Sequence, residues 1–154
     1  MSASVQRVRA ALTAAGLDVT LRAFPEGTRT AQDAAAAIGV QVGQIVKSLV
    51  FATETGDPVL VLASGANRVD ERRVGELLGT AIGRADAALV REATGYAIGG
   101  VPPVGHATAM PTLVDEDLLA FDEVWAAAGT PRDVFAIAPA DLVRASGGQV
   151  ATVT

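Results

Sequence analysis

The chain has 154 residues and a net charge of −5, and its sequence pI is near 4.7. This length predicts one domain, spanning residues 1–154. The acidic balance argues against a broad nucleic-acid surface, which needs clustered Lys and Arg, but it leaves room for a partner held at one small site.

The residue types that are missing narrow the chemistry further. The sequence has no cysteine, which excludes disulfides, thiolate nucleophiles and cysteine-ligated zinc. Its single histidine cannot build a multi-histidine metal site. No stretch has the length and apolar character of a membrane span or of a signal-peptide core. We therefore expect a soluble, cytoplasmic protein without a metal or other cofactor.

Helix and strand signals alternate irregularly through the first half of the chain. Val5, Val8 and Leu12 recur at helical spacing. Thr30, with Asp33 three residues later, is typical of a helix N-terminus. From these signals and from apolar runs bounded by turn residues, we predict a helix over 5–15, a strand over 19–24, a helix over 30–38, strands over 47–53 and 58–63, and a helix over 70–78.

The second half continues in the same mixed order. Asp86 and Gly95 are placed as the start and stop of a helix, and Pro139 suits the first turn of another. The acidic residues 115–117 are expected to be a solvated turn. We predict a strand over 81–82, a helix over 86–93, strands over 112–114, 123–128 and 133–138, a helix from 139, and a strand over 149–153. This order favours an α/β or α+β fold with a mixed sheet.

One cation differs from all the others. Of the twelve Lys and Arg residues, only Lys47 is a lysine, and it lies in the apolar run 44–51. A charged head is costly in such a run unless it has a partner, and the pKa of a lysine falls readily when the amine is desolvated. The plainer interpretation is a side chain with its stem on the core and its amine in water. Position alone leaves both interpretations open.

The second unusual stretch is a loop containing Gly99, Gly100, Pro102 and Pro103. Paired glycines let a backbone approach a ligand closely, and prolines reduce the entropy that the loop loses on binding. An ordinary surface turn has the same composition. The spacing matches neither a dinucleotide-binding fingerprint nor a P-loop.

Other candidates for chemistry are weaker. Ser64 and Ser146 lack the surroundings of a nucleophile elbow, and Ser48 faces away from Lys47 if both lie on one strand. His106 is expected at the surface, where it could touch a ligand.

Three stretches together resemble a known family. They are Thr30-x-x-Asp-Ala-Ala, the run 45–51 around Lys47, and Gly95-Tyr-x-x-Gly-Gly-x-x-Pro103-x-Gly105. This order and spacing resembles the YbaK/prolyl-tRNA-synthetase-associated aminoacyl-tRNA editing domains, over nearly the whole chain. The lysine and the Gly-x-x-x-Pro loop are fairly specific in combination, whereas either alone is weak.

The resemblance implies a fold and an activity. The fold is a single domain, α/β in class (α+β mixed), with a curved mixed sheet flanked by helices. The activity is trans-acting hydrolysis of the ester in mischarged tRNA, above all tRNA(Pro) carrying a small wrong amino acid. Water, a terminal ribose hydroxyl or the substrate's own side chain would attack. The implied partners are the acceptor end of that tRNA and prolyl-tRNA synthetase.

The resemblance also implies roles for residues. Lys47 would orient and charge-stabilise the acceptor end without becoming covalently attached, and the loop backbone would hold the aminoacyl carbonyl. The substrate-binding candidates are Thr30, Ser48, Gly99, Gly100, Val101, Pro102, Pro103 and His106. No motif sets the edited amino acid, so Ala, Ser, Cys and small non-protein amino acids all stay open.

Two other functions fit the same residues. One is a non-catalytic tRNA- or synthetase-binding module of this fold, and the other is a lyase that forms a Schiff base through Lys47. The low pI predicts weak, salt-sensitive tRNA binding limited to the acceptor end, aided by Arg68, Arg72 and Arg73 or by a synthetase partner. The simpler interpretation of those three arginines is a solvated helix face.

Overall fold

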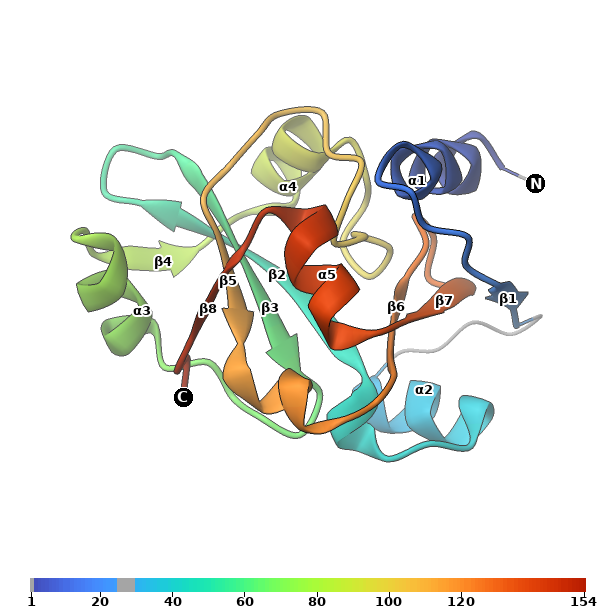
Figure 1. The fold of residues 1–154 in the computed structure, drawn as a ribbon. Helices are drawn as coiled ribbons and strands as arrows, with labels where there is room; N and C mark the ends of the chain where they lie inside the picture. Colours follow the sequence, from blue (N-terminus) through green and yellow to red (C-terminus); the bar gives the residue numbers. More distant parts are fainter. Residues whose placement is uncertain (1, 25–29) are drawn as a thin grey trace.

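The computed structural model describes residues 2–24 and 30–154. These residues form a mixed α/β fold (Figure 1). The helices are α1 (Ala3–Ala14), α2 (Ala31–Ile38), α3 (Glu71–Leu78), α4 (Ala87–Thr94) and α5 (Pro139–Ser146), with short 3-10 helices η1 (Val42–Gln44) and η2 (Glu116–Ala120). The strands are β1 (Leu21–Ala23), β2 (Val46–Thr53), β3 (Pro58–Ser64), β4 (Ile82–Arg84), β5 (Thr112–Asp115), β6 (Val124–Ala127), β7 (Asp133–Ile137) and β8 (Gln149–Ala151).

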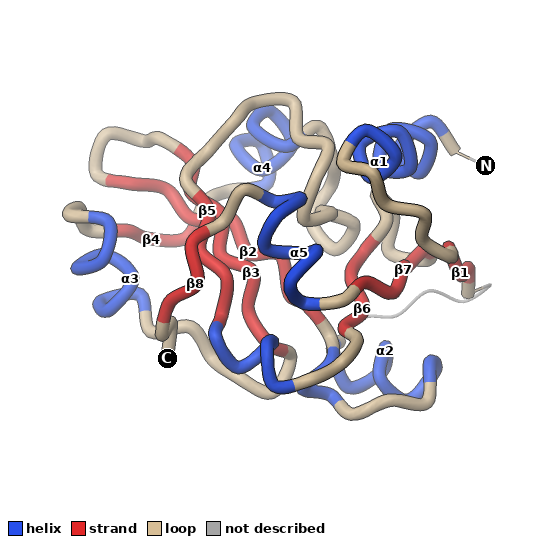
Figure 2. The backbone as a smooth tube through the Cα atoms, in the orientation of Figure 1, coloured by secondary structure: helices blue, strands red, loops and turns tan. Residues whose placement is uncertain are grey.

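The strands form two sheets (Figure 2). The larger has the order β4-β2-β3-β5-β8 and is mixed, because β2 pairs antiparallel with β3 and β4 whereas β5 pairs parallel with β3 and β8. The smaller, β1-β7-β6, is antiparallel. Among the described residues, one parallel bridge between Ile45 and Trp125 joins the two ladders. The predicted mixed α/β architecture is confirmed, with its strands divided between two sheets.

Strand β3 is the centre of the fold and is buried on both faces, as its continuous apolar sequence requires. Leu60 and Leu62 belong to a core shared with α1, α4, α5 and the smaller sheet. Val61 and Ala63 point to the opposite face, where they pack with Val74 of α3. Figure 1 accordingly shows α5 crossing in front of the larger sheet and α3 beside β4.

Helix α2 packs separately from these two cores. Its buried residues Ala34 and Ala35 contact Ile45, which precedes β2, and the half-buried Trp125 of β6 packs against the same cluster. The helix therefore covers the point where the two sheets meet, which places it beside the candidate site.

The predicted helix starts are confirmed by capping hydrogen bonds. The side chains of Thr30, Asp70 and Asp86 accept hydrogen bonds from main-chain N–H groups two or three residues later in the chain, at 3.0, 3.0 and 2.8 Å respectively. Such a cap contributes roughly 0.5 to 2 kcal/mol. Within the described chain, no helix combines the length and apolar character that crossing a membrane requires.

The expectation of a solvated acidic turn at 115–117 is wrong for its first residue. Asp115 is only 1% exposed, and its carboxylate accepts a hydrogen bond from the main-chain N–H of Ser64 at 3.0 Å. The parallel pairing of β5 with β3 carries the end of β5 into the interior, and the carboxylate is tolerated there because main-chain and amide N–H groups satisfy it. The strand predicted over 81–82 lies at Ile82–Arg84.

Candidate active site

Lys47 lies on the first half of β2, opposite Ala63 of β3. On the other side of β2, strand β4 pairs only with residues 51–53. The edge of β2 around Lys47 therefore has no strand partner among the described residues. The lysine side chain is partly buried, and an open strand edge is accessible to a ligand.

The long loop after α4 is held from within by Tyr96. The residue is 1% exposed, and its hydroxyl donates to Gly105 O at 2.9 Å, which ties the start of the loop to a point nine residues later. Arg7 of α1 stacks over the ring at 4.6 Å from the centroid and donates to Gly95 O at 3.0 Å. The loop thus has a fixed shape before any ligand arrives, which lowers the entropic cost of binding.

The same loop is pressed against the turn between β6 and β7. A Cβ added to Gly100 would lie 2.8 Å from Thr130 Cα and 3.0 Å from Gly129 O. These are backbone atoms that cannot move aside cheaply. Gly100 is therefore needed for close approach, and it places Gly99 at the rim of the site.

Two adjacent cavities lie along the open edge of β2, with volumes of about 370 and 510 Å³. Both are lined by residues from β2 and from the loop: Lys47, Ser48, Leu49, Ile98, Gly99 and Val101. The smaller extends between α2 and the second sheet, and Lys47 is the only ionisable side chain among its described lining residues. The larger also contains Arg68, Glu71 and Arg84. The strand and the loop singled out in the sequence thus share one site.

The amine of Lys47 has a defined partner. Nζ donates a hydrogen bond to the main-chain carbonyl of Asn67. Burial lowers the pKa of Lys47 from its ordinary value, and the negative charge of Asp115 opposes this effect. The side chain is thus neither fully solvated nor ion-paired, a state common in functional sites.

The structure places the predicted substrate-binding residues in two groups. Thr30, Ser48, Gly99 and Val101 line a cavity together with Lys47. The others lie behind this surface and shape the loop: Gly100, Pro102, Pro103 and His106.

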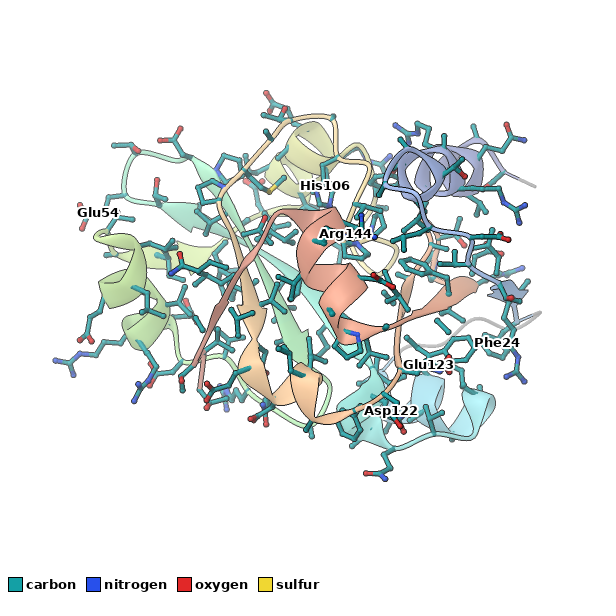
Figure 3. The ribbon with its side chains drawn as sticks, viewed as in Figure 1. Phe24, Glu54, His106, Asp122, Glu123 and Arg144 are labelled. Atoms are coloured by element: carbon teal, nitrogen blue, oxygen red, sulfur yellow. The ribbon has the colours of Figure 1, made fainter. Side chains whose placement is uncertain are left out.

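His106 belongs to the supporting group. It is half-buried, and its ring N–H at Nε2 donates to Pro102 O at 2.7 Å. It lies in the loop between α4 and β5 (Figure 3). Burial lowers the pKa of His106, and the hydrogen bond to Pro102 partly offsets that shift.

Three lining residues carry no distinctive sequence signal. Trp125 packs against the cluster around Ile45 and also forms part of the smaller cavity wall. Ile98 is 61% exposed and borders both cavities, and Arg84 ends a strand too short to stand out. Ser48 Oγ and Trp125 Nε1 are buried without a partner in the described structure, which leaves two polar atoms beside the site unpaired.

The described residues contain no cluster of three or more His, Asp or Glu side chains that could hold a metal ion. The ionisable groups of the site are Lys47, Arg68, Arg84 and Glu71. Arg72 and Arg73, grouped with Arg68 in the sequence, line neither cavity. The arrangement can bind an anionic or carbonyl-containing group beside an apolar pocket.

Comparison with known proteins gives concordant results. A family model described as "Aminoacyl-tRNA editing domain" matches residues 25–145. A crystal structure of a candidate trans-editing enzyme for prolyl tRNA synthetase is 49% identical, with a TM-score of 0.94, covering 100% of this chain and 98% of that one.

Two bacterial relatives are more distant. The uncharacterized Bacillus subtilis protein YwhH is 29% identical over 147 residues, covering 96% of this chain and 94% of the relative. Enterococcus faecalis EbsC, named as a candidate Cys-tRNA(Pro)/Cys-tRNA(Cys) deacylase, is 25% identical over 133 residues, covering 86% of this chain and 81% of the relative.

Proposed function

The chain belongs to the aminoacyl-tRNA editing domain family, and from this premise we propose that it is a trans-acting deacylase of mischarged tRNA. The substrate is tRNA(Pro) esterified to a small, uncharged, wrong amino acid. The relative described as a trans-editing enzyme for prolyl tRNA synthetase supports the choice of tRNA.

The observation that carries the proposal is the position of Lys47. The chain's only lysine lies on an open strand edge, at the border between an apolar cavity and one that contains two arginines. The apolar cavity suits an uncharged aminoacyl side chain, and the arginine-containing cavity suits the terminal nucleotide with its phosphate. The ester linking these two groups would lie at Lys47.

In this arrangement the ammonium stabilises charge that develops during hydrolysis. Water adds to the ester carbonyl carbon and loses a proton to solvent, the carbonyl oxygen becomes negatively charged, and the bond to the ribose oxygen then breaks as that oxygen takes up a proton. The products are the free amino acid and a tRNA with a free terminal hydroxyl. A fixed cation beside the oxyanion is most effective in a partly dry site.

The test is a panel of purified tRNA(Pro) samples carrying Ala, Ser, Cys or Pro, incubated with the protein and with Lys47→Ala. We expect rapid loss of the ester from at least one mischarged tRNA, slow loss from Pro-tRNA(Pro), and no acceleration by the variant. Unchanged ester across the panel, with a folded protein that still binds tRNA, would favour a non-catalytic binding module. A borohydride-trapped adduct with a carbonyl compound would favour Schiff-base chemistry.

A further inference from the structure

The carboxylate of Asp115 is buried without an ion-pair partner. It is 1% exposed, and in the described structure no Lys or Arg lies within ion-pair distance of it. Oδ2 accepts from Ser64 N at 3.0 Å and from Asn67 Nδ2 at 2.9 Å, and Oδ1 accepts from Asp117 N at 3.0 Å. The bond to Asp117 N also caps the 3-10 helix η2, but a buried charge is expensive even with hydrogen bonds.

Asn67 connects this carboxylate to the candidate catalytic lysine. Its side-chain amide donates to Asp115, and its main-chain carbonyl accepts from Lys47 Nζ. The carbonyl is fixed because Asn67 N also donates to Ser64 O at 3.0 Å, and the Ser64 hydroxyl donates to Gly43 O at 2.8 Å. One residue therefore holds the ammonium on one side and the carboxylate on the other.

Several charged side chains lie near Lys47, and they differ in their effect on its protonation. Arg68, Glu71 and Arg84 line the larger cavity together with Lys47. Asp117 accepts a hydrogen bond at 2.7 Å from the same Asn67 amide that donates to Asp115. The neighbouring residues of β3 and β6 have no ionisable side chains in the cavities. Of these groups, Asp115 is the one whose charge raises the pKa of Lys47 against the effect of burial.

We propose that Asn67 and Asp115 are positioning residues for Lys47. The Asn67 carbonyl fixes the ammonium at the border of the two cavities, and the Asp115 charge keeps the amine protonated there. The consequence for catalysis rests on the proposed deacylase function, whereas the consequence for the protonation of Lys47 does not.

The protonation of Lys47 can be measured directly because the chain has a single lysine. Protein labelled with carbon-13 lysine gives one lysine Cε signal, and its pH titration reports the pKa. We expect a lower Lys47 pKa in Asp115→Asn than in wild type. Asp122→Asn, the same change at an exposed residue that lines neither cavity, is the matched control and should titrate close to wild type. An unchanged Lys47 pKa in Asp115→Asn would overturn the proposal.

The catalytic consequence is tested by single-turnover deacylation across pH, corrected for spontaneous ester hydrolysis. In Asp115→Asn the rate should decline at a lower pH than in wild type, because Lys47 loses its proton earlier.

In Asn67→Ala the amide link is lost from a partly exposed residue, and we expect a rate about tenfold lower with little change in KM. This second variant decides the question if Asp115→Asn does not fold. A wild-type rate in Asn67→Ala would contradict the positioning role. An inactive wild-type protein would refute the proposed function and leave the titration result valid.

Discussion

Lys47 is a point charge in a confined position, and this shapes the effect of replacing it. Its ammonium donates a hydrogen bond to the Asn67 carbonyl. Two other residues of the same strand, Val46 and Leu49, pack into two different cores. An arginine carries the same charge on a longer, planar, five-donor head, which does not reproduce a single bond to a carbonyl in this space.

We therefore expect Lys47→Arg to lose deacylation by about a hundredfold or more, the scale of removing one oxyanion donor. Melting should stay close to wild type, and Lys47→Ala should be neutral or mildly stabilising because it removes a partly buried charge. Single-turnover rates and thermal melts check both points. An active, normally folded Lys47→Arg protein would make the lysine an ordinary surface cation.

His106 predicts a pH-dependent loss of stability. Burial lowers its pKa in the folded chain, so the unfolded chain binds the proton more tightly. The contribution of neutral His106 to the free energy of unfolding is complete above the pKa of histidine in the unfolded chain, about 6.5. It decreases as the pH falls below that value and levels off below the pKa in the folded chain. Urea unfolding between about pH 8 and pH 5 should show this slope in wild type and a shallower one in His106→Gln. Parallel curves for the two proteins would contradict the assignment.

For single residues, the sequence identified the unusual ones but did not predict which of them contact one another. Lys47 stood out as the only lysine. The chain of contacts from Lys47 through Asn67 to Asp115 spans loops and strands far apart in sequence. No local pattern encodes it, because the burial of Asp115 depends on the parallel pairing of β5 with β3.

The loop after α4 and the turn between β6 and β7 act as one structural unit. Gly100 fits against the backbone of Thr130 and Gly129, so the position of Gly99 depends on a turn some thirty residues later. A defect in this contact should affect both stability and the site.

We expect Gly100→Ala to lower the free energy of unfolding by about 1 to 3 kcal/mol, the usual cost of overpacking, and to reduce deacylation. Gly83→Ala on β4 is the matched control, since an added Cβ there meets nothing within 4 Å. Denaturant unfolding and deacylation rates measure the two effects. Similar losses in both variants would show that the docking contact is unimportant.

Elements with strong local signals were predicted closely. Helices α2, α3 and α4 follow their capping residues, and β2 and β3 follow their apolar runs. The division into two sheets was not predicted, because strand partners are chosen by tertiary packing and not by propensity.

The molecule as a whole is acidic, with a net charge of −5. Glu54 lies at the edge of the molecule in the view of Figure 3, and Asp122 and Glu123 are likewise exposed. Under the proposed function, attraction to tRNA would therefore depend on the few cations at the site. Arg68 lines the larger cavity, whereas Arg72 faces Glu76 on the exposed side of α3 at 3.9 Å.

Arg68→Gln should weaken tRNA binding and reduce the slope of log affinity against log salt by about one, as expected for one lost phosphate contact. Arg72→Gln carries the same charge change outside the cavity and should bind almost as wild type does. Fluorescence anisotropy with an acceptor-stem minihelix at several salt concentrations separates the two. Equal effects would indicate a diffuse electrostatic attraction.

The smaller cavity has walls from two separately hydrogen-bonded sheets that meet at one bridge between Ile45 and Trp125. The width of the smaller cavity is set by the side chains of α2 that pack on this bridge and not by the hydrogen bonds within the two sheets. Exchanging an alanine of α2 for a larger or smaller residue can thus change the room for an amino acid without unpairing a strand or touching Lys47. Under the proposed function, selectivity for the amino acid could therefore diverge between descendants of this chain while Lys47 and its contacts are inherited unchanged.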